Sequence, residues 1–200
     1  DTTRVHRTSD GPMYDFKELP SGKFICSGVL SEYEGTPVSR IFRVEADGAL
    51  DTTFHPPPLH EYGAAFSYLP LADGRLLIGG FFHFDGAPDT VNLVRLLPDG
   101  QLDPTFNHLH FDVTYSTSSL PLVLQIMPLD DHRDIIVGGF DRIDGQVRGG
   151  IALIDTAGYL LDDYFTSNGC GAWNDGSSQT DFKDIDGINR AMSNGPRIMT

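Results

Sequence analysis

The residue types best suited to binding a ligand gather in the stretch 166–187. It contains the only tryptophan, Trp173, followed by Asp175 and, further along, Asp181. Long loops on rigid scaffolds are where binding residues collect, and an exposed indole can stack on the face of a sugar ring. The stretch therefore predicts a ligand site at Trp173, Asp175 and Asp181, with a glycan as the ligand. The alternative is a solvated acidic loop with Trp173 packed against the body of the fold.

Three acidic residues of the same stretch predict a metal site. Asp181, Asp184 and Asp186 offer carboxylate oxygens, the ligands that Ca²⁺ prefers. The glutamate that an EF-hand loop needs further downstream is missing after Gly187, so a solvated acidic loop again stands as the alternative. Calcium is the one cofactor that the sequence suggests.

Histidines offer a second, weaker metal hypothesis. His108 and His110 are two residues apart, which on a strand directs both rings to one side. No carboxylate or third histidine lies at a supporting spacing, so the alternative is a polar connecting strand. We expect His83, within the aromatic run 81–84, to face outward or to satisfy a turn.

Signatures of catalysis are missing. The sequence has no Gly-x-Ser-x-Gly elbow and no glycine-rich phosphate loop, and 28 acidic residues make sequence proximity between carboxylates uninformative. The two cysteines differ in setting: Cys26 lies in an apolar run and Cys170 among glycines. We expect Cys26 to behave as a core residue, and the spacing indicates no disulfide framework. These patterns favour a non-enzymatic protein.

The composition favours strands and turns over helices. Of the 28 acidic residues 23 are aspartate, and the 200 residues include 22 Gly and 13 Pro. Asp, Gly and Pro favour turns and weaken helices. The formal net charge of −14 repels phosphate groups, which argues against nucleic acid and anionic membranes as partners. No apolar run is long enough to span a bilayer, so we expect no membrane insertion.

Internal repeats define the architecture. Three segments align, at 19–54, 71–106 and 129–165, and the aspartates near their ends are 52 and 59 residues apart, at 51, 103 and 162. A period in the fifties is the size of a propeller blade. The apolar runs 76–78 and 135–137 show no alternation, which is typical of strands covered on both faces.

Each repeat carries the same turn and packing signals. The dipeptides Asp47-Gly48 and Asp99-Gly100 lie between apolar runs and predict hairpins, and Asp144-Gly145 predicts a further turn. Glycine doublets at 79–80 and 138–139 predict a bulge or a close backbone approach. We expect Phe54, Phe106 and Phe165 to wedge between neighbouring blades, and the aspartate three residues before each to bind local backbone amides.

The sequence therefore predicts an all-β fold, a β-propeller arc of about three four-stranded blades with partial blades at both ends. The predicted repeat units are 13–54, 65–106 and 123–165, with a fourth beginning at about 188–200. Residues 1–3 match 51–53, the end of a unit, so we expect an incomplete ring. Because open strand edges are a liability, we expect the missing blades to come from the rest of a longer chain or from another chain.

The central repeat resembles a known family. The series 73–81, with Asp85-Gly86 and the run 99–106, is similar to the bacterial delta-sixty repeat. The first unit departs from the pattern at Ser27 and the third at 130–132. The resemblance implies a tandem β-propeller repeat of large secreted or cell-surface proteins, without an assigned activity or catalytic residues. It suggests an extracellular scaffold that binds a protein or polysaccharide. The alternative is a carbohydrate-binding or carbohydrate-processing propeller, with its site near 166–187 or at the central channel.

Overall fold

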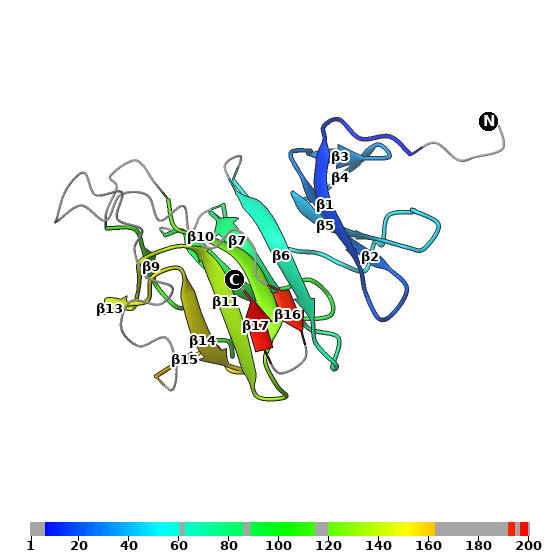
Figure 1. Ribbon diagram of the computed structural model, residues 1–200. Coiled ribbons are helices and arrows are strands. Elements are labelled where there is room, and N and C mark those ends of the chain that lie inside the picture. The colour runs from blue at the N-terminus through cyan, green and yellow to red at the C-terminus, as the bar shows by residue number, and fades with distance from the viewer. Residues whose placement is uncertain are drawn as a thin grey trace.

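Every regular element in the described part of the chain is a β-strand. The computed structural model describes residues 7–60, 63–85, 89–114 and 120–162, and the backbone of two short strands at 192–194 and 197–199. Within these ranges there is no helix, and all strand pairs are antiparallel. The described residues accordingly contain no helix that is long and apolar enough to cross a membrane. Figure 1 shows the main sheets following one another along the chain. The predicted all-β propeller arc is confirmed.

The first main sheet, blade 1, has the strand order β1-β2-β5. Its strands are β1 (Met13–Glu18), β2 (Phe24–Gly28) and β5 (Ile41–Val44). A single bridge between Val44 and Leu50 marks the place of a fourth strand. The turn between them is the predicted Asp-Gly turn: Gly48 has a φ of 85°, and Asp47 accepts a hydrogen bond from the Ala49 amide at 2.9 Å. A positive φ of this kind favours glycine because it has no Cβ.

Blades 2 and 3 repeat this arrangement. Blade 2 has the order β6-β7-β8 and contains β6 (Ala64–Pro70), β7 (Leu76–Phe82) and β8 (Val91–Leu96). Its fourth strand is again a single bridge, between Leu96 and Leu102. Blade 3 has four full strands, β10 (Leu122–Pro128), β11 (Arg133–Gly139), β14 (Ile151–Asp155) and β15 (Leu160–Leu161). The four-stranded blade is therefore complete in blade 3 and reduced at its last strand in the other two.

Short strands connect successive blades. The segment that enters each blade pairs with the loop between that blade's second and third strands, through Ser9 and Tyr33, Leu59 and Phe84, and Phe111 and Ile143. The strands concerned are β3 (Glu32–Tyr33), β4 (Thr36–Pro37), β9 (Phe111–Asp112), β12 (Arg142–Ile143) and β13 (Gln146–Val147). Each blade is thus linked to the connector that precedes it.

Two of these loops end in tight hairpins of the predicted kind. Asp144 and Gly145 both have positive φ, 49° and 75°, and Glu34 and Gly35 repeat this with 52° and 74°. Positive φ at both central residues defines a type I′ turn, whose twist matches that of the flanking strands. The predicted turn at Asp144-Gly145 is therefore confirmed, and in the first unit a glutamate adopts the strained conformation that Asp adopts in the third.

A bulge recurs at the same place in each blade. The register between first and second strands shifts by one residue at Tyr14, Phe66 and Leu124. Beside each bulge the second strand carries a glycine, at Gly28, Gly80 and Gly138. A Cβ there would lie 2.3 Å, 2.1 Å or 1.9 Å from a backbone carbonyl oxygen at the start of the first strand or just before it. The predicted close backbone approach is confirmed. It involves the second glycine of the doublet 79–80 but the first of 138–139. The turns before β7 and β11 have the same length, from Leu71 to Arg75 and from Leu129 to Arg133, so Val137 takes the place of Gly79.

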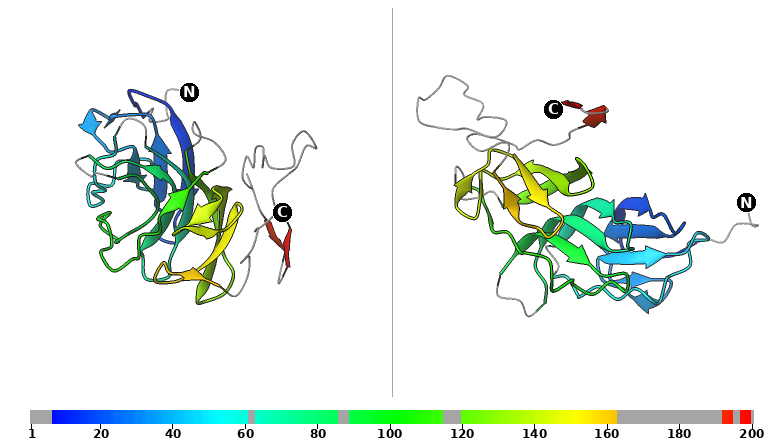
Figure 2. Two further views of the ribbon diagram at one scale, coloured as in Figure 1. Left: turned by 90° about the vertical axis from the view of Figure 1, so that its left-hand side faces the viewer. Right: turned by 90° about the horizontal axis from the view of Figure 1, so that it is seen from below.

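Most of the apolar core lies between blades. One cluster joins Ile25, Ile41 and Phe54 of blade 1 to Ile78 and Val94 of blade 2. A second cluster joins the opposite face of blade 2 to blade 3, through residues such as Leu77, Leu93, Phe106, Val123 and Ile136. Figure 2 shows the blades side by side along the chain. The predicted wedge positions of Phe54 and Phe106 are confirmed, and blade 2 is covered on both faces.

A last hairpin lies near the C-terminal end. It pairs β16 (Met192–Asn194) with β17 (Arg197–Met199), and Asn194 lies opposite Arg197. A hairpin here is consistent with a fourth unit beginning at about 188–200. The other predicted partial unit, residues 1–3, lies outside the described residues.

The glycine beside the bulge in blade 3 gives a test with a matched neighbour. Gly138→Ala places a methyl group against the Leu122 carbonyl, whereas a Cβ at Gly139 meets nothing within 4 Å. We expect Gly138→Ala to lower the free energy of unfolding by about 2 kcal/mol or more and Gly139→Ala by about 0.5 kcal/mol or less. Urea denaturation measures both values, and equal losses would contradict the close approach.

Candidate functional site

The site residues predicted from the sequence lie outside the described residues. These are Trp173, Asp175 and Asp181 for a ligand, and Asp181, Asp184 and Asp186 for calcium. The glycan and calcium sites therefore stay predictions. Among the residues that the structure does describe, no group of three or more His, Cys, Asp or Glu could hold a metal ion.

The two histidines of the connecting segment before β9 point to the same side, as predicted, although the segment is not a strand there. His108 and His110 are both exposed, and Leu109 between them is buried. His110 has a partner that spacing alone did not reveal: its Nε2 lies 3.1 Å from Oδ1 of Asp112. The structure therefore pairs His110 with a carboxylate on the same short segment.

The most elaborate polar arrangement is a clasp at the end of blade 1, built around Asp51. Its side chain is almost fully buried and accepts a hydrogen bond from the Thr53 amide at 2.9 Å. Arg43 Nε lies 2.6 Å and Lys23 Nζ 2.8 Å from Oδ2 of the same carboxylate. The Arg43 guanidinium also lies over the ring of Phe54, 4.5 Å from its centroid. Asp51 therefore joins the turn before β2 to β5, and through Arg43 it also holds the closing aromatic residue.

Blade 2 repeats the clasp residue for residue. Asp103 accepts from the Thr105 amide at 2.9 Å, Arg95 Nε lies 2.8 Å from its carboxylate and Arg75 Nη1 3.1 Å. Arg95 lies over Phe106, with 4.8 Å to the ring centroid. Asp51 and Asp103 confirm the prediction that an aspartate three residues before the closing phenylalanine binds local amides.

Each clasp also reaches into the next blade. Arg43 Nη1 donates a hydrogen bond to the Pro98 carbonyl of blade 2 at 2.9 Å. Arg95 donates in the same way to the Thr156 carbonyl of blade 3. Because the arginine is held by its own blade's aspartate, its remaining N–H groups are oriented toward the neighbouring turn. The clasp therefore links one blade to the next.

The electrostatics of the clasp make it sensitive to acid. Burial by itself raises the pKa of Asp51 and Asp103, but hydrogen bonds from the threonine and the basic side chains outweigh it and hold both pKa values well below the usual range. A lowered carboxyl pKa contributes stability that is present above the unfolded value of about 4 and is lost as the pH falls through the folded value. The clasps are thus complete at neutral pH.

Blade 3 departs from the pattern. Leu153 occupies the position of Arg43 and Arg95, since it lies opposite Ile135 as they lie opposite Ile25 and Leu77. The side chain of Asp162 is 71% exposed and contacts Arg148 instead. The outward face of blade 3 is therefore apolar where the other two blades carry an arginine.

A buried carboxyl replaces an apolar residue in the same blade. Asp134, 7% exposed, takes the position of Leu76, and burial, followed by the nearby charge of Asp130, raises its pKa to about 6. A buried carboxylate without a cationic partner is costly, so the group holds its proton more tightly when folded. Asp134 thus weakens the contact with blade 2 at neutral pH.

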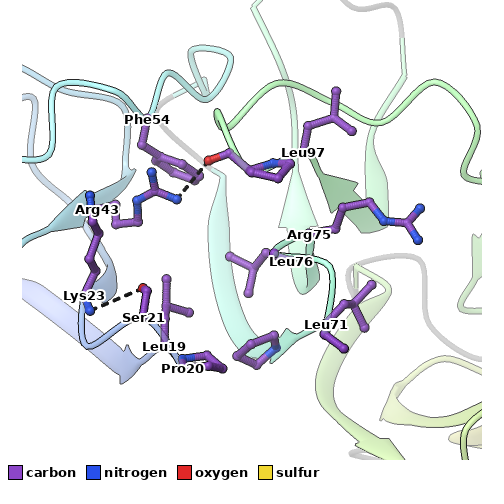
Figure 3. A pocket seen from close by; sticks show the side chains of 14 residues that line it. Leu19, Pro20, Ser21, Lys23, Arg43, Phe54, Leu71, Arg75, Leu76 and Leu97 are labelled. Carbon is purple, nitrogen blue, oxygen red and sulfur yellow. Dashed lines mark hydrogen bonds between the residues drawn. The ribbon is translucent and has the colours of Figure 1, made fainter.

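A cavity of about 310 Å³ lies beside the first clasp, between blades 1 and 2. Figure 3 shows Lys23, Arg43 and Phe54 on one side of it and Leu71 and Leu76 on the other. Its basic side chains are already bound to carboxylates, Lys23 and Arg43 to Asp51 and Arg75 to Asp103. The cavity therefore presents an apolar surface with compensated charge, which does not favour an anion.

Cys26 is a free, buried thiol on β2. Burial raises its pKa to about 11, so it is protonated at neutral pH and chemically inert. This confirms its predicted role as a core residue. Cys170 lies outside the described residues.

Comparison with known proteins agrees with the repeat architecture. Residues 19–54 and 71–106 match a β-propeller domain of unknown function, DUF5122. These are the first two segments of the sequence alignment, so the β-propeller character predicted for them is confirmed. No curated protein and no solved structure matches the chain.

The basic residues of the clasps were not predicted from the sequence. The signal was available, because Lys23 and Arg75 each follow a turn glycine, and Arg43 and Arg95 recur eight residues before their aspartates. Repeated charged residues inside otherwise apolar strands indicate a buried ion pair within each unit.

The second clasp gives a test with an internal control. Asp103→Asn leaves the buried Arg95 without its countercharge, and we expect a loss of about 3 kcal/mol in unfolding free energy at pH 7. Asp73 also binds Arg75, but its side chain is 52% exposed, so Asp73→Asn should cost about 0.5 kcal/mol or less. Urea denaturation of both variants checks this. Similar losses would show that the clasp is not a buried pair.

Asp134 predicts a pH-dependent gain in stability. Its raised pKa means that its contribution to stability is complete below pH about 4 and is lost as the pH rises through about 6. We expect Asp134→Leu, which copies Leu76, to raise the unfolding free energy by about 2 kcal/mol at pH 7.5 and by clearly less at pH 4. Denaturation across this pH range measures the difference. The exposed neighbour Asp131→Leu serves as the control, and a gain independent of pH would refute the assignment.

Proposed function

We propose that this chain is a non-enzymatic β-propeller repeat module that acts as a structural or interaction scaffold in an exported or surface-displayed bacterial protein. The match of two repeats to a β-propeller domain of unknown function supports the module, and the resemblance to the delta-sixty repeat supports the setting. The strongly negative net charge argues against nucleic acid as a partner.

One residue carries the proposal, Phe16 on β1. It lies opposite Cys26, as Tyr68 lies opposite Ile78 and Ile126 opposite Ile136. Tyr68 and Ile126 are 2% and 6% exposed because the preceding blade covers them, whereas Phe16 is 66% exposed. Phe16 therefore marks a face of the kind that another blade covers elsewhere in this molecule.

Other apolar side chains near Phe16 enlarge this exposed face. Its ring lies 6.1 Å from that of Phe24, and Tyr14 and Met13 on the same strand are 64% and 50% exposed. Large exposed apolar side chains in one place indicate an interaction surface. The other two blade interfaces show what fits such a face: the aliphatic surface of a neighbouring blade, as with Ile25 and Ile41 against blade 2.

The partner is therefore another blade, supplied by the rest of a longer chain or by a second chain. A protein or polysaccharide would then bind the loop faces of the assembled arc, where side chains vary between units. Propeller folds support unrelated activities, so the fold itself does not identify that ligand.

Sedimentation velocity tests the role of this face. We expect the isolated chain to associate reversibly in the micromolar range, and Phe16→Ser to weaken the association at least tenfold. Tyr159, 57% exposed on a turn of blade 3, provides the matched control, and Tyr159→Ser should leave association unchanged. A chain that stays monomeric at all concentrations, or association that survives Phe16→Ser, would contradict the proposal.

A further inference from the structure

Two histidines, His60 and His83, lie together where the chain enters blade 2. The connector residue Leu59 pairs with Phe84, which follows β7, and the His60 amide donates a hydrogen bond to the His83 carbonyl at 2.7 Å. His60 and His83 therefore lie opposite each other on neighbouring antiparallel segments. Side chains in such a pair project to the same side and are close enough to interact. The aromatic run 81–84 by itself predicts only that His83 faces outward or satisfies a turn, and it does not predict this pairing.

The distance between the imidazole rings suits a shared metal ion. Their centroids are 5.2 Å apart and their planes are inclined by 44°. A tetrahedral ion about 2.1 Å from an imidazole nitrogen lies about 3.2 Å from the ring centre, so two rings sharing it are about 5.2 Å apart. The observed spacing of the ring centres is therefore compatible with two histidines that bind one ion.

The space around the pair leaves room for the remaining ligands. His60 and His83 line a cavity of about 580 Å³, whose other walls are Ala64, Phe66, Phe81, Leu120 and Leu122. Both histidines are only partly buried, so an ion can enter from solvent. Among the described residues no third His, Cys, Asp or Glu completes a metal-binding group, so water would occupy the other positions.

We propose that His60 and His83 form a two-imidazole site for a divalent transition-metal ion of the Zn²⁺ and Cu²⁺ class. Imidazole nitrogen is a preferred ligand for both ions, whereas the oxygen-seeking Ca²⁺ and Mg²⁺ would be rejected. Coordination positions held by water in an otherwise apolar cavity make this an open site. It shares no residue with the calcium site predicted at Asp181, Asp184 and Asp186.

Isothermal titration of the full chain with Zn²⁺ tests the site. We expect one ion to bind per chain, with His60→Gln and His83→Gln each weakening binding at least tenfold. The glutamine variants keep the backbone hydrogen bond between the two residues, so folding should be unaffected, which circular dichroism checks. The double variant His108→Gln/His110→Gln is the matched control, because it removes the other close histidine group, including the contact of His110 with Asp112.

The control also defines the results that would overturn the proposal. Absence of Zn²⁺ binding would do so, as would binding that survives His83→Gln or is lost in the His108→Gln/His110→Gln variant. Electron paramagnetic resonance with Cu²⁺ gives an independent readout, since two imidazoles should produce hyperfine coupling to two nitrogens. A spectrum with a single nitrogen, or one that His60→Gln leaves unchanged, would assign the pair to ring stacking alone.

Discussion

Burial of apolar surface between neighbouring sheets is the interaction on which the rest of this structure depends. A sheet with hydrophobic side chains on both faces cannot be stable in water by itself, because each face needs a cover. Blade 2 shows the solution in full: Ile78 and Val94 meet blade 1, and Leu77 and Leu93 meet blade 3. The bulges and the glycines beside them serve this packing, since they let the first and second strands of each sheet approach closely. Stability is therefore a property of adjacent blades together.

The polar clasps fix how neighbouring blades are aligned against each other. Apolar contact alone leaves two sheets free to slide, whereas Arg43 bound to Asp51 can reach the Pro98 carbonyl in only one register. The connector bridges act at the other edge, where Leu59 pairs with Phe84. Each blade is thus fixed at both ends of its strands. One of the cavities described lies beside the first clasp, and the other lies beside the bridge between Leu59 and Phe84.

The sequence predicted the architecture well because its signals are local and repeated. Each signal depends on only a few neighbouring residues, as in the Asp-Gly turns, the apolar runs and the closing phenylalanines. Because the signals recur in each repeat, they can be recognised in the sequence. What it did not predict depends on residues distant in the chain. The pairing of His60 with His83 follows from the bridge between a connector and a loop more than twenty residues later, which no period reveals. The alignment of the doublet 138–139 with 79–80 was wrong by one residue, because the turns before β7 and β11 have the same length and Val137 takes the place of Gly79. Of the candidate site, the amide contacts of Asp51 and Asp103 were predicted, but their basic partners were not.

Leu153 has a consequence for how such an array could grow. Gene duplication of the second repeat, inserted after itself, would give each copy an arginine at its outgoing face and a receptive turn carbonyl in the copy that follows. The same duplication of the third repeat would place Leu153 at the junction, where it offers no hydrogen bond to the incoming turn. The first two repeats therefore present the same outgoing hydrogen bond, whereas the third does not.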